Sequence, residues 1–94
     1  MSFELQFLPS ALKEWEKLGA PVRAQFKKKL TERLVHPRVT KDALHGLRDH
    51  YKIKLRDAGY RLVYRVEDAT ITVTVVAVGK RERSSVYRQA ARRG

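Results

Sequence analysis

The sequence contains no cysteine, few glycines and no long apolar segment, and each absence excludes a class of protein. Without cysteine there is no disulfide framework and no thiolate chemistry. The five glycines are scattered, so no glycine-rich loop is present to bind phosphate. No apolar run approaches the roughly 20 residues that a membrane-spanning helix requires. Residues 1–10 lack the basic start and apolar stretch of a signal peptide. We therefore expect a cytoplasmic protein with no membrane partner.

Side chains that hold metal ions are also sparse. His36, His45 and His50 lack the spacing of metal ligands and lie in or beside one predicted loop, so we assign them no role. The 10 acidic residues form no paired carboxylate cluster of the kind that binds Mg²⁺ in nucleases. We expect no metal ion and no other cofactor. If the protein cleaves a substrate, it does so without metal.

Positive charge, in contrast, is abundant. The 94 residues include 21 Lys and Arg against 10 Asp and Glu, which gives a formal net charge of +11 and a pI near 10.5. A chain of this length forms one small domain, residues 1–94. So large a charge on one domain is self-repelling unless a polyanion binds. Nucleic acid is the leading candidate partner, an acidic protein is second and an anionic membrane third.

The N-terminal half of the sequence predicts a strand followed by two helices. Apolar residues alternate with polar ones over residues 3–7, as in a half-buried strand. Pro9 breaks this pattern, and helical spacing follows over residues 12–18, ending near Gly19. Pro21 then begins a second helix, which Pro37 ends. The apolar positions of this helix recur every four residues: Val22, Phe26, Leu30 and Leu34.

The C-terminal half predicts three strands and a last helix. After a loop at residues 38–50, residues 51–66 form a hairpin connected by residues 57–59. Residues 71–78, ITVTVVAV, predict a strand covered on both faces over part of its length, which Gly79 ends. The basic tail turns helical near Ser84. The fold class is therefore α+β: a mainly antiparallel sheet with two N-terminal helices packed on one face and a short C-terminal helix, in the order β-α-α-β-β-β-α.

The hairpin YKIKLRDAGYRLVYRV concentrates positive charge on one face. If its apolar residues face the helices, strand alternation places four basic residues on the opposite face: Lys52, Lys54, Arg61 and Arg65. Like charges side by side on a sheet repel each other, so stability does not explain this gathering. Arg81 follows the last strand and can reach back over this face, and Tyr87 lies six residues further on. A basic surface beside an aromatic ring is suited to single-stranded RNA.

A structural explanation is nevertheless the more probable one for each residue taken alone. Charge on the exposed face of an antiparallel sheet is ordinary, and lysine on an edge strand discourages aggregation. Lys27–Lys29 form a solvated helix face that also has the charge to contact nucleic acid. By their phase in the strands, Tyr51, Tyr60 and Tyr64 are core or core-edge residues rather than base stackers.

Two long motifs reveal a family resemblance. YKIKLRDAGYRLVYRV followed by VGKRERSSVY closely resembles the RelE toxins of bacterial toxin–antitoxin systems. ALKEWEKLG, PVRAQFKKKL and HPR match the same pattern, so the likeness runs from about residue 3 to about residue 90. The resemblance implies a ribosome-dependent endoribonuclease that cuts mRNA at the ribosomal A site. The family's catalytic positions fall on residues of the family's own type: Lys52, Lys54, Arg61, Arg81 and Tyr87.

The resemblance also implies how the bond is broken, namely by attack of the RNA 2′-OH without metal. Lys52 is our candidate general base, because neighbouring cations and partial burial favour the neutral form of a lysine. Tyr87 is an alternative base, a base stacker or an orienting group. Lys54, Arg61 and Arg81 would stabilise the negative transition state, and Arg81 is the candidate proton donor to the leaving oxygen.

The same resemblance implies several partners. These are a RelB-like antitoxin, the 70S ribosome with its 16S rRNA, and mRNA in the A site. The complex with antitoxin is expected to bind operator DNA. Further basic residues are candidates for contact with RNA and the ribosome: Lys27, Lys28, Lys29, Arg56, Arg65, Arg83 and Arg88.

Two rival functions remain open at this point. A ParE-like toxin shares the fold but inhibits DNA gyrase, and it does not need the five catalytic residues. A non-catalytic RNA- or ribosome-binding module would use the same basic face for affinity alone. A charge-preserving Lys52→Arg change separates the RNA-binding module from the endoribonuclease, because a binder tolerates it and an enzyme with a lysine base does not.

Overall fold

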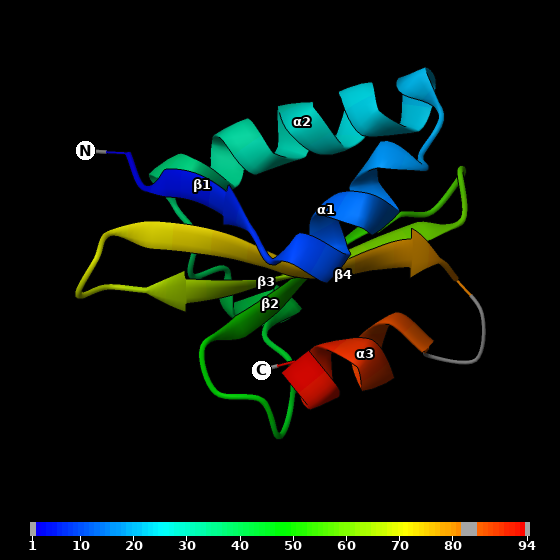
Figure 1. Ribbon diagram of the computed structural model, residues 1–94. Helices are drawn as coiled ribbons and strands as arrows, with labels where there is room; N and C mark the ends of the chain where they lie inside the picture. The colour runs from blue at the N-terminus through cyan, green and yellow to red at the C-terminus, as the bar shows by residue number, and fades with distance from the viewer. Residues whose placement is uncertain (1, 82–84, 94) are drawn as a thin grey trace.

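The computed structural model describes residues 2–81 and 85–93, which form a four-stranded sheet with helices on both faces (Figure 1). Helices α1 (Pro9–Glu16) and α2 (Ala20–Val35) cover one face, and α3 (Ser85–Arg93) packs on the other. The strands are β1 (Glu4–Phe7), β2 (His50–Leu55), β3 (Tyr60–Glu67) and β4 (Thr72–Lys80). The observed order, β-α-α-β-β-β-α, confirms the predicted α+β fold.

The strands lie in the order β1-β4-β3-β2. The β2–β3 and β3–β4 pairs are antiparallel, whereas β1 runs parallel to β4, so the sheet is mainly antiparallel as predicted. Strand β4 is central and flanked by helices on both sides, and its residues Thr72–Val78 are all buried. This burial confirms the prediction that a run of β-branched residues forms a strand covered on both faces.

Several predicted boundaries differ from the observed ones. Pro9 ends the strand pattern as predicted, but it is also the first residue of α1, because proline fits the first helical turn. Gly79 does not end β4, since it pairs with Arg61 and the strand continues to Lys80. The hairpin connection has four residues, 56–59, and Gly59 lies in it at φ 71°. The predicted loop at residues 38–50 contains a 3₁₀ turn (Thr40–Asp42) and gives its last residue to β2.

The larger core lies between the sheet and helices α1 and α2. Phe26 and Leu30 from the predicted stripe of α2 are buried, and Val22 and Leu34 pack partly against them. Trp15 of α1 packs against Phe26, with ring centroids 6.2 Å apart. The sheet contributes alternate residues of each strand, among them Ile53, Leu62, Tyr64, Val73 and Val75.

A smaller core lies between the sheet and α3. Val63, Val76 and Ala77 from the sheet meet Val86 and Ala90 from the helix. Two consecutive residues of β4 take part because the pairing shifts here: Val63 lies opposite Ala77, and Tyr64 lies opposite Val75. The extra residue in β4 is a β-bulge, which turns both Val76 and Ala77 toward α3.

A buried polar cluster joins the end of α2 to the sheet. The hydroxyl of Tyr64 donates to the carbonyl oxygen of Pro37 (2.6 Å) and accepts from Nη1 of Arg33 (2.9 Å). Nη2 of Arg33 in turn donates to Asp42 in the 3₁₀ turn (2.6 Å). Burial raises the pKa of Tyr64, although Arg33 opposes the shift, so the hydroxyl keeps the proton that it donates.

We expect Tyr64→Phe to destabilise the protein without changing its shape. The substitution leaves the carbonyl of Pro37 and one N–H of Arg33 without their partner, a loss worth about 1–3 kcal/mol. Urea unfolding followed by circular dichroism measures this change. Tyr60→Phe is the control, because the Tyr60 hydroxyl makes no hydrogen bond within the part of the chain that the structure describes. Equal effects of the two substitutions would show that the cluster adds nothing to stability.

Candidate active site

Strand register brings three of the predicted catalytic residues onto one face. Lys54 of β2 lies directly opposite Arg61 of β3, and Lys52 lies opposite Val63. Because Val63 packs beneath α3, this is the face that α3 partly covers. The alternating residues Ile53 and Leu62 point the other way, into the core beneath α1 and α2. The alternation of the sequence thus separates an apolar face from a cationic one, as predicted.

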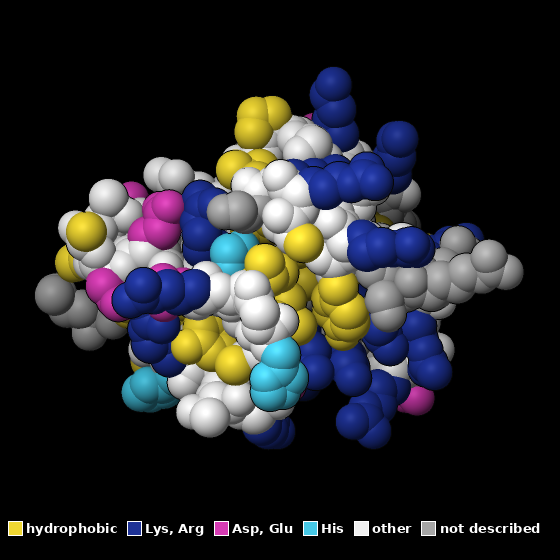
Figure 2. All heavy atoms as spheres, turned by 90° about the horizontal axis from the view of Figure 1, so that it is seen from below, with side chains coloured by type: hydrophobic (Ala, Val, Ile, Leu, Met, Phe, Trp, Pro, Cys, Tyr) yellow, Lys and Arg dark blue, Asp and Glu magenta, His cyan; other side chains and the backbone are white. Residues whose placement is uncertain are grey.

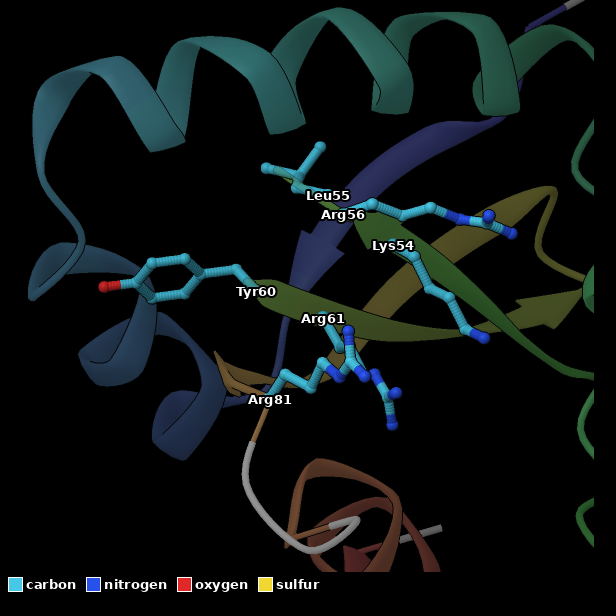
Figure 3. Close-up of a pocket in the computed structure, with 6 residues that line it drawn as sticks. All are labelled: Lys54, Leu55, Arg56, Tyr60, Arg61 and Arg81. Carbon is cyan, nitrogen blue, oxygen red and sulfur yellow. The ribbon is translucent and has the colours of Figure 1, made fainter. Parts of the chain in front are cut away.

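Arg81 joins this face from the end of β4. Its backbone N–H donates to the carbonyl oxygen of Gly59 (2.7 Å), which fixes the chain beside the hairpin connection. The side chains of Lys54, Arg61 and Arg81 lie on the same side of the sheet in Figure 3. They share the lining of a hollow of about 250 Å³ with Leu55, Arg56 and Tyr60. Four of these six residues are cationic, so the hollow is suited to an anion such as a phosphodiester.

Tyr87 reaches the same site from α3. The guanidinium carbon of Arg61 lies 5.1 Å from the centroid of the Tyr87 ring, in a cation–π contact. Burial raises the pKa of the Tyr87 hydroxyl, and the positive charge of Arg61 partly opposes this shift. The phenol form is therefore favoured, which makes this hydroxyl a better donor than a base.

Repulsion between the cations is visible in the pKa of Lys54. The positive charge of Lys52 lowers the pKa of Lys54, with smaller contributions from desolvation and from Arg61, Arg56 and Arg81. Asp42 lines a hollow together with Lys54, but it is held by Arg33 in an ion pair of 2.6 Å. Lys29 and Arg56 extend the basic surface, since they line a small hollow with Lys54 and Asp42.

The other predicted RNA-binding cations are spread over the molecule. Lys27 and Lys28 are exposed on α2, across the sheet from α3. Arg65 lies on the cationic face, but its Nη2 is 3.0 Å from Glu67, so its charge is partly balanced. Arg83 lies outside the described residues. Arg88 is exposed on α3 beside an apolar hollow of about 420 Å³ between α3 and residues 44–47.

The face that carries α3 has a mixed character. Lys and Arg side chains surround a patch of hydrophobic side chains there, and most of the visible acidic side chains lie at one edge (Figure 2). The apolar hollow is lined by Leu44, Leu47, Tyr87 and Ala91 among others. The ring of Tyr87, which contacts Arg61, therefore forms one wall of this hollow.

The sequence gives no indication that some of the residues around the site contribute to it. Arg33 donates to the carbonyl oxygen of Lys52 (3.3 Å) as well as to Asp42, so it fixes the strand that bears the lysines. Asp42 lies nine positions after Arg33, and no motif links them. His50, to which the sequence assigned no role, is buried in β2 with its Nδ1 2.7 Å from the carbonyl oxygen of Arg48.

Residues 2–81 and 85–93 contain no group of three or more His, Cys, Asp or Glu side chains placed to hold a metal ion. Within the same residues, no helix has the length and apolar character needed to cross a membrane.

Comparison with known proteins defines the class to which this fold and site belong. The chain is a member of the ParE toxin family of type II toxin–antitoxin systems, whose sequence model matches residues 5–85. Within that family the resemblance to RelE inferred from the motifs is confirmed. The chain is 56% identical over 93 residues to the mRNA interferase toxin RelE of Escherichia coli K12. This alignment covers 99% of the chain and 98% of the relative. The mRNA interferase RelE of Shigella flexneri matches equally well.

Solved structures show the same relationship. A mutant of E. coli toxin RelE in the free state superimposes with a TM-score of 0.92 at 54% identity, covering 99% of this chain and 98% of that one. The toxin in the intact E. coli RelBE toxin–antitoxin complex gives a TM-score of 0.84 at 55% identity, covering 87% of this chain and 100% of that one.

We expect Lys52→Gln to raise the pKa of Lys54. The positive charge of Lys52 disfavours the protonated form of Lys54, so its removal moves the pKa of Lys54 back up toward its ordinary value. An NMR pH titration of the lysine side-chain nitrogens measures the change. Lys17→Gln removes the same charge from the residue that follows α1, where Lys17 is exposed, and serves as the control. An unchanged Lys54 titration in the Lys52 variant would mean that the two lysines do not interact.

Proposed function

We propose that this protein is the toxin of a type II toxin–antitoxin system and that it cleaves mRNA in the ribosomal A site. One observation carries the proposal. The residues Lys52, Lys54, Arg61, Arg81 and Tyr87 converge on one face, in a chain 56% identical to an mRNA interferase. Residues 1–94 act as one toxin domain, and they act in the cytoplasm, where the ribosomes are.

The nucleophile is supplied by the substrate. RNA carries a 2′-OH beside each phosphodiester, and cleavage requires that this hydroxyl lose its proton and align with the phosphorus. Lys52 is the proposed general base. Lys52 lies two residues before Lys54 on β2 and on the same cationic face, where a phosphodiester would bind beside it. The raised pKa of Tyr87 argues against the alternative that its phenolate is the base.

The remaining cations act on the transition state. The phosphorane-like transition state carries more negative charge than the diester, so cations that are fixed beforehand stabilise it selectively. Lys54 and Arg61 are held in register by the β2–β3 pair, and the backbone of Arg81 is tied to Gly59. Arg81 also donates a proton or hydrogen bond to the leaving 5′-oxygen, although an arginine releases a proton reluctantly. The products are a 2′,3′-cyclic phosphate and a 5′-hydroxyl.

Tyr87 orders the nucleotide at the cut. Its ring contacts the guanidinium of Arg61 and also forms a wall of the apolar hollow. A nucleobase can therefore stack beside the ring while the adjacent phosphate contacts Arg61. Its protonated hydroxyl is available to orient the nucleophile by a hydrogen bond.

The ribosome supplies what the site lacks. The five residues include no histidine–carboxylate pair, so alignment of the substrate must supply a large part of the acceleration. Ribosome-held mRNA is a substrate whose geometry is already constrained. The surplus cations, including Lys27–Lys29, Arg56, Arg83 and Arg88, contact 16S rRNA, which makes cleavage salt-sensitive and weak on free RNA.

Two further partners follow from the charge and from the relatives. The E. coli relative forms a RelBE toxin–antitoxin complex. A RelB-like antitoxin with an acidic, amphipathic segment would be steered toward a target of net charge +11. Such a complex binds operator DNA through the antitoxin.

Gyrase inhibition is the second candidate, because the matching family model is the one described for ParE toxins. Inhibition by binding does not require a cluster of mutually repelling lysines and arginines opposite an aromatic ring. The clustering of these residues on one face and the identity to RelE therefore favour RNA cleavage over gyrase inhibition and over RNA binding alone.

We expect a single 2′-deoxy substitution at the cut position to abolish cleavage of ribosome-bound mRNA at that position. The reaction loses its nucleophile, whereas binding of the backbone phosphates is unaffected. Mapping the fragment ends by primer extension detects the loss. A 2′-deoxy nucleotide placed several codons upstream is the control and leaves cleavage unchanged. Persistent cutting at the substituted position would rule out attack by the 2′-OH.

A further inference from the structure

An ion pair joins the last turn of α3 to α1. Nη1 of Arg93, in the last turn of α3, lies 2.8 Å from Oε1 of Glu14 in α1. Nη2 of Arg93 donates to the second carboxylate oxygen of Glu14 (3.2 Å), so the pair is bidentate. The two side chains are 19% and 31% exposed, which limits screening by solvent.

The same pair satisfies the free edge of β4. Strand β1 ends at Phe7, opposite Val75, so the following residues of β4 have no neighbouring strand on that side, although β3 pairs with them on the other. Oε1 of Glu14 accepts a hydrogen bond from the backbone N–H of Val78 (3.2 Å), and Nη1 of Arg93 donates to the carbonyl oxygen of Val76 (2.9 Å). The ion pair thus replaces the hydrogen bonds that another strand would make, and it anchors α3 to the rigid centre of the sheet.

Helix α3 also packs on the sheet through apolar side chains and through the contact of Tyr87 with Arg61. Its nine residues are too few to form a stable isolated helix, so tertiary contacts must hold it. The buried residues of α3 are Val86 and Ala90, both small. Arg93 continues their stripe, because positions 86, 90 and 93 lie on one side of a helix. The positive charge of Arg93 in the last turn is also favoured by the helix dipole.

We infer that the Glu14–Arg93 pair is a latch that positions Tyr87 in the active site. It fixes the C-terminal end of α3 against the sheet, and the same helix carries Tyr87 to its contact with Arg61. When the pair is broken, α3 shifts or frays and Tyr87 leaves Arg61. Glu14 and Arg93 are positioning residues, since they contact β4 rather than the reacting groups. The catalytic consequence rests on the proposed function, but the structural one does not.

Hydrogen–deuterium exchange of the free, full-length protein tests the structural part. In Arg93→Gln, the amides of α3 should exchange about tenfold faster than in the unchanged protein, as the loss of a charge-assisted bond implies. Exchange in β2 and β3 should not change. Arg92→Gln is the matched control, because it removes the same charge from the adjacent, exposed position. Unchanged exchange in α3 of Arg93→Gln would overturn the latch.

Steady-state cleavage of mRNA on programmed ribosomes tests the catalytic part. Arg93→Gln and Glu14→Gln should each lower kcat about tenfold, which corresponds to about 1.4 kcal/mol in activation free energy, and should leave KM within about twofold. Arg92→Gln and Glu16→Gln should keep the original kcat. A purely global loss of stability would lower the amount of active protein and would show as a lower melting temperature, which is measured in parallel.

The double variant Glu14→Gln/Arg93→Gln separates a coupled pair from two independent effects. If the residues act only through each other, the double variant loses no more kcat than either single variant. Arg93→Lys, which keeps the charge, should recover part of the loss. Additive losses, an equal fall in Arg92→Gln, or a change confined to KM would each overturn the latch. If the unchanged protein cuts nothing, the proposed function fails, and the exchange experiment still decides whether the latch exists.

Discussion

Repulsion between cations on one face of the sheet is the constraint on which the arrangement of this molecule depends. Lys54 lies directly opposite Arg61, where an opposite charge would favour pairing of the strands. The pairing holds because the neighbouring residues Ile53 and Leu62 are fully buried on the other face, and each such side chain contributes about 1.5–3 kcal/mol. The apolar face therefore provides the stability that the cationic face reduces, and the cations stay close together before any substrate binds.

The site consequently has two parts that are held differently. The lysines and arginines belong to paired strands, and Arg33 braces the lysine strand through the carbonyl oxygen of Lys52. Tyr87 belongs to a short helix whose contacts with the rest of the protein include the apolar packing of Val86 and Ala90 and the Glu14–Arg93 ion pair. A preorganised cationic surface favours the negative transition state, whereas a separately attached aromatic residue allows a nucleotide to be ordered beside it. In the proposed mechanism, the strands supply the electrostatic surface and the separately attached helix supplies the contact with the nucleotide.

The sequence predicted the parts that depend on periodicity. Alternation in YKIKL and YRLVY determined which residues of β2 and β3 face the core, and therefore that Lys52, Lys54 and Arg61 share a face. Periodicity could not predict the contacts made by single side chains far apart in the chain. The pair of Glu14 and Arg93 spans 79 residues, and the bulge at Val76 has no sequence signal, so the attachment of α3 required the structure.

Primer extension on mRNA carried by programmed ribosomes tests the central claim, that the cationic face cleaves RNA with a lysine as base. The unchanged protein is compared with Lys52→Arg, which preserves charge, and with Lys17→Arg, the same substitution at an exposed position of the chain away from the site. The account predicts a discrete stop in the A-site codon that is absent on free mRNA, lost in Lys52→Arg and retained in Lys17→Arg. A stop that survives in Lys52→Arg would contradict the claim that Lys52 is the base. No stop from the unchanged protein, together with inhibition of gyrase, would show that the cationic face only binds.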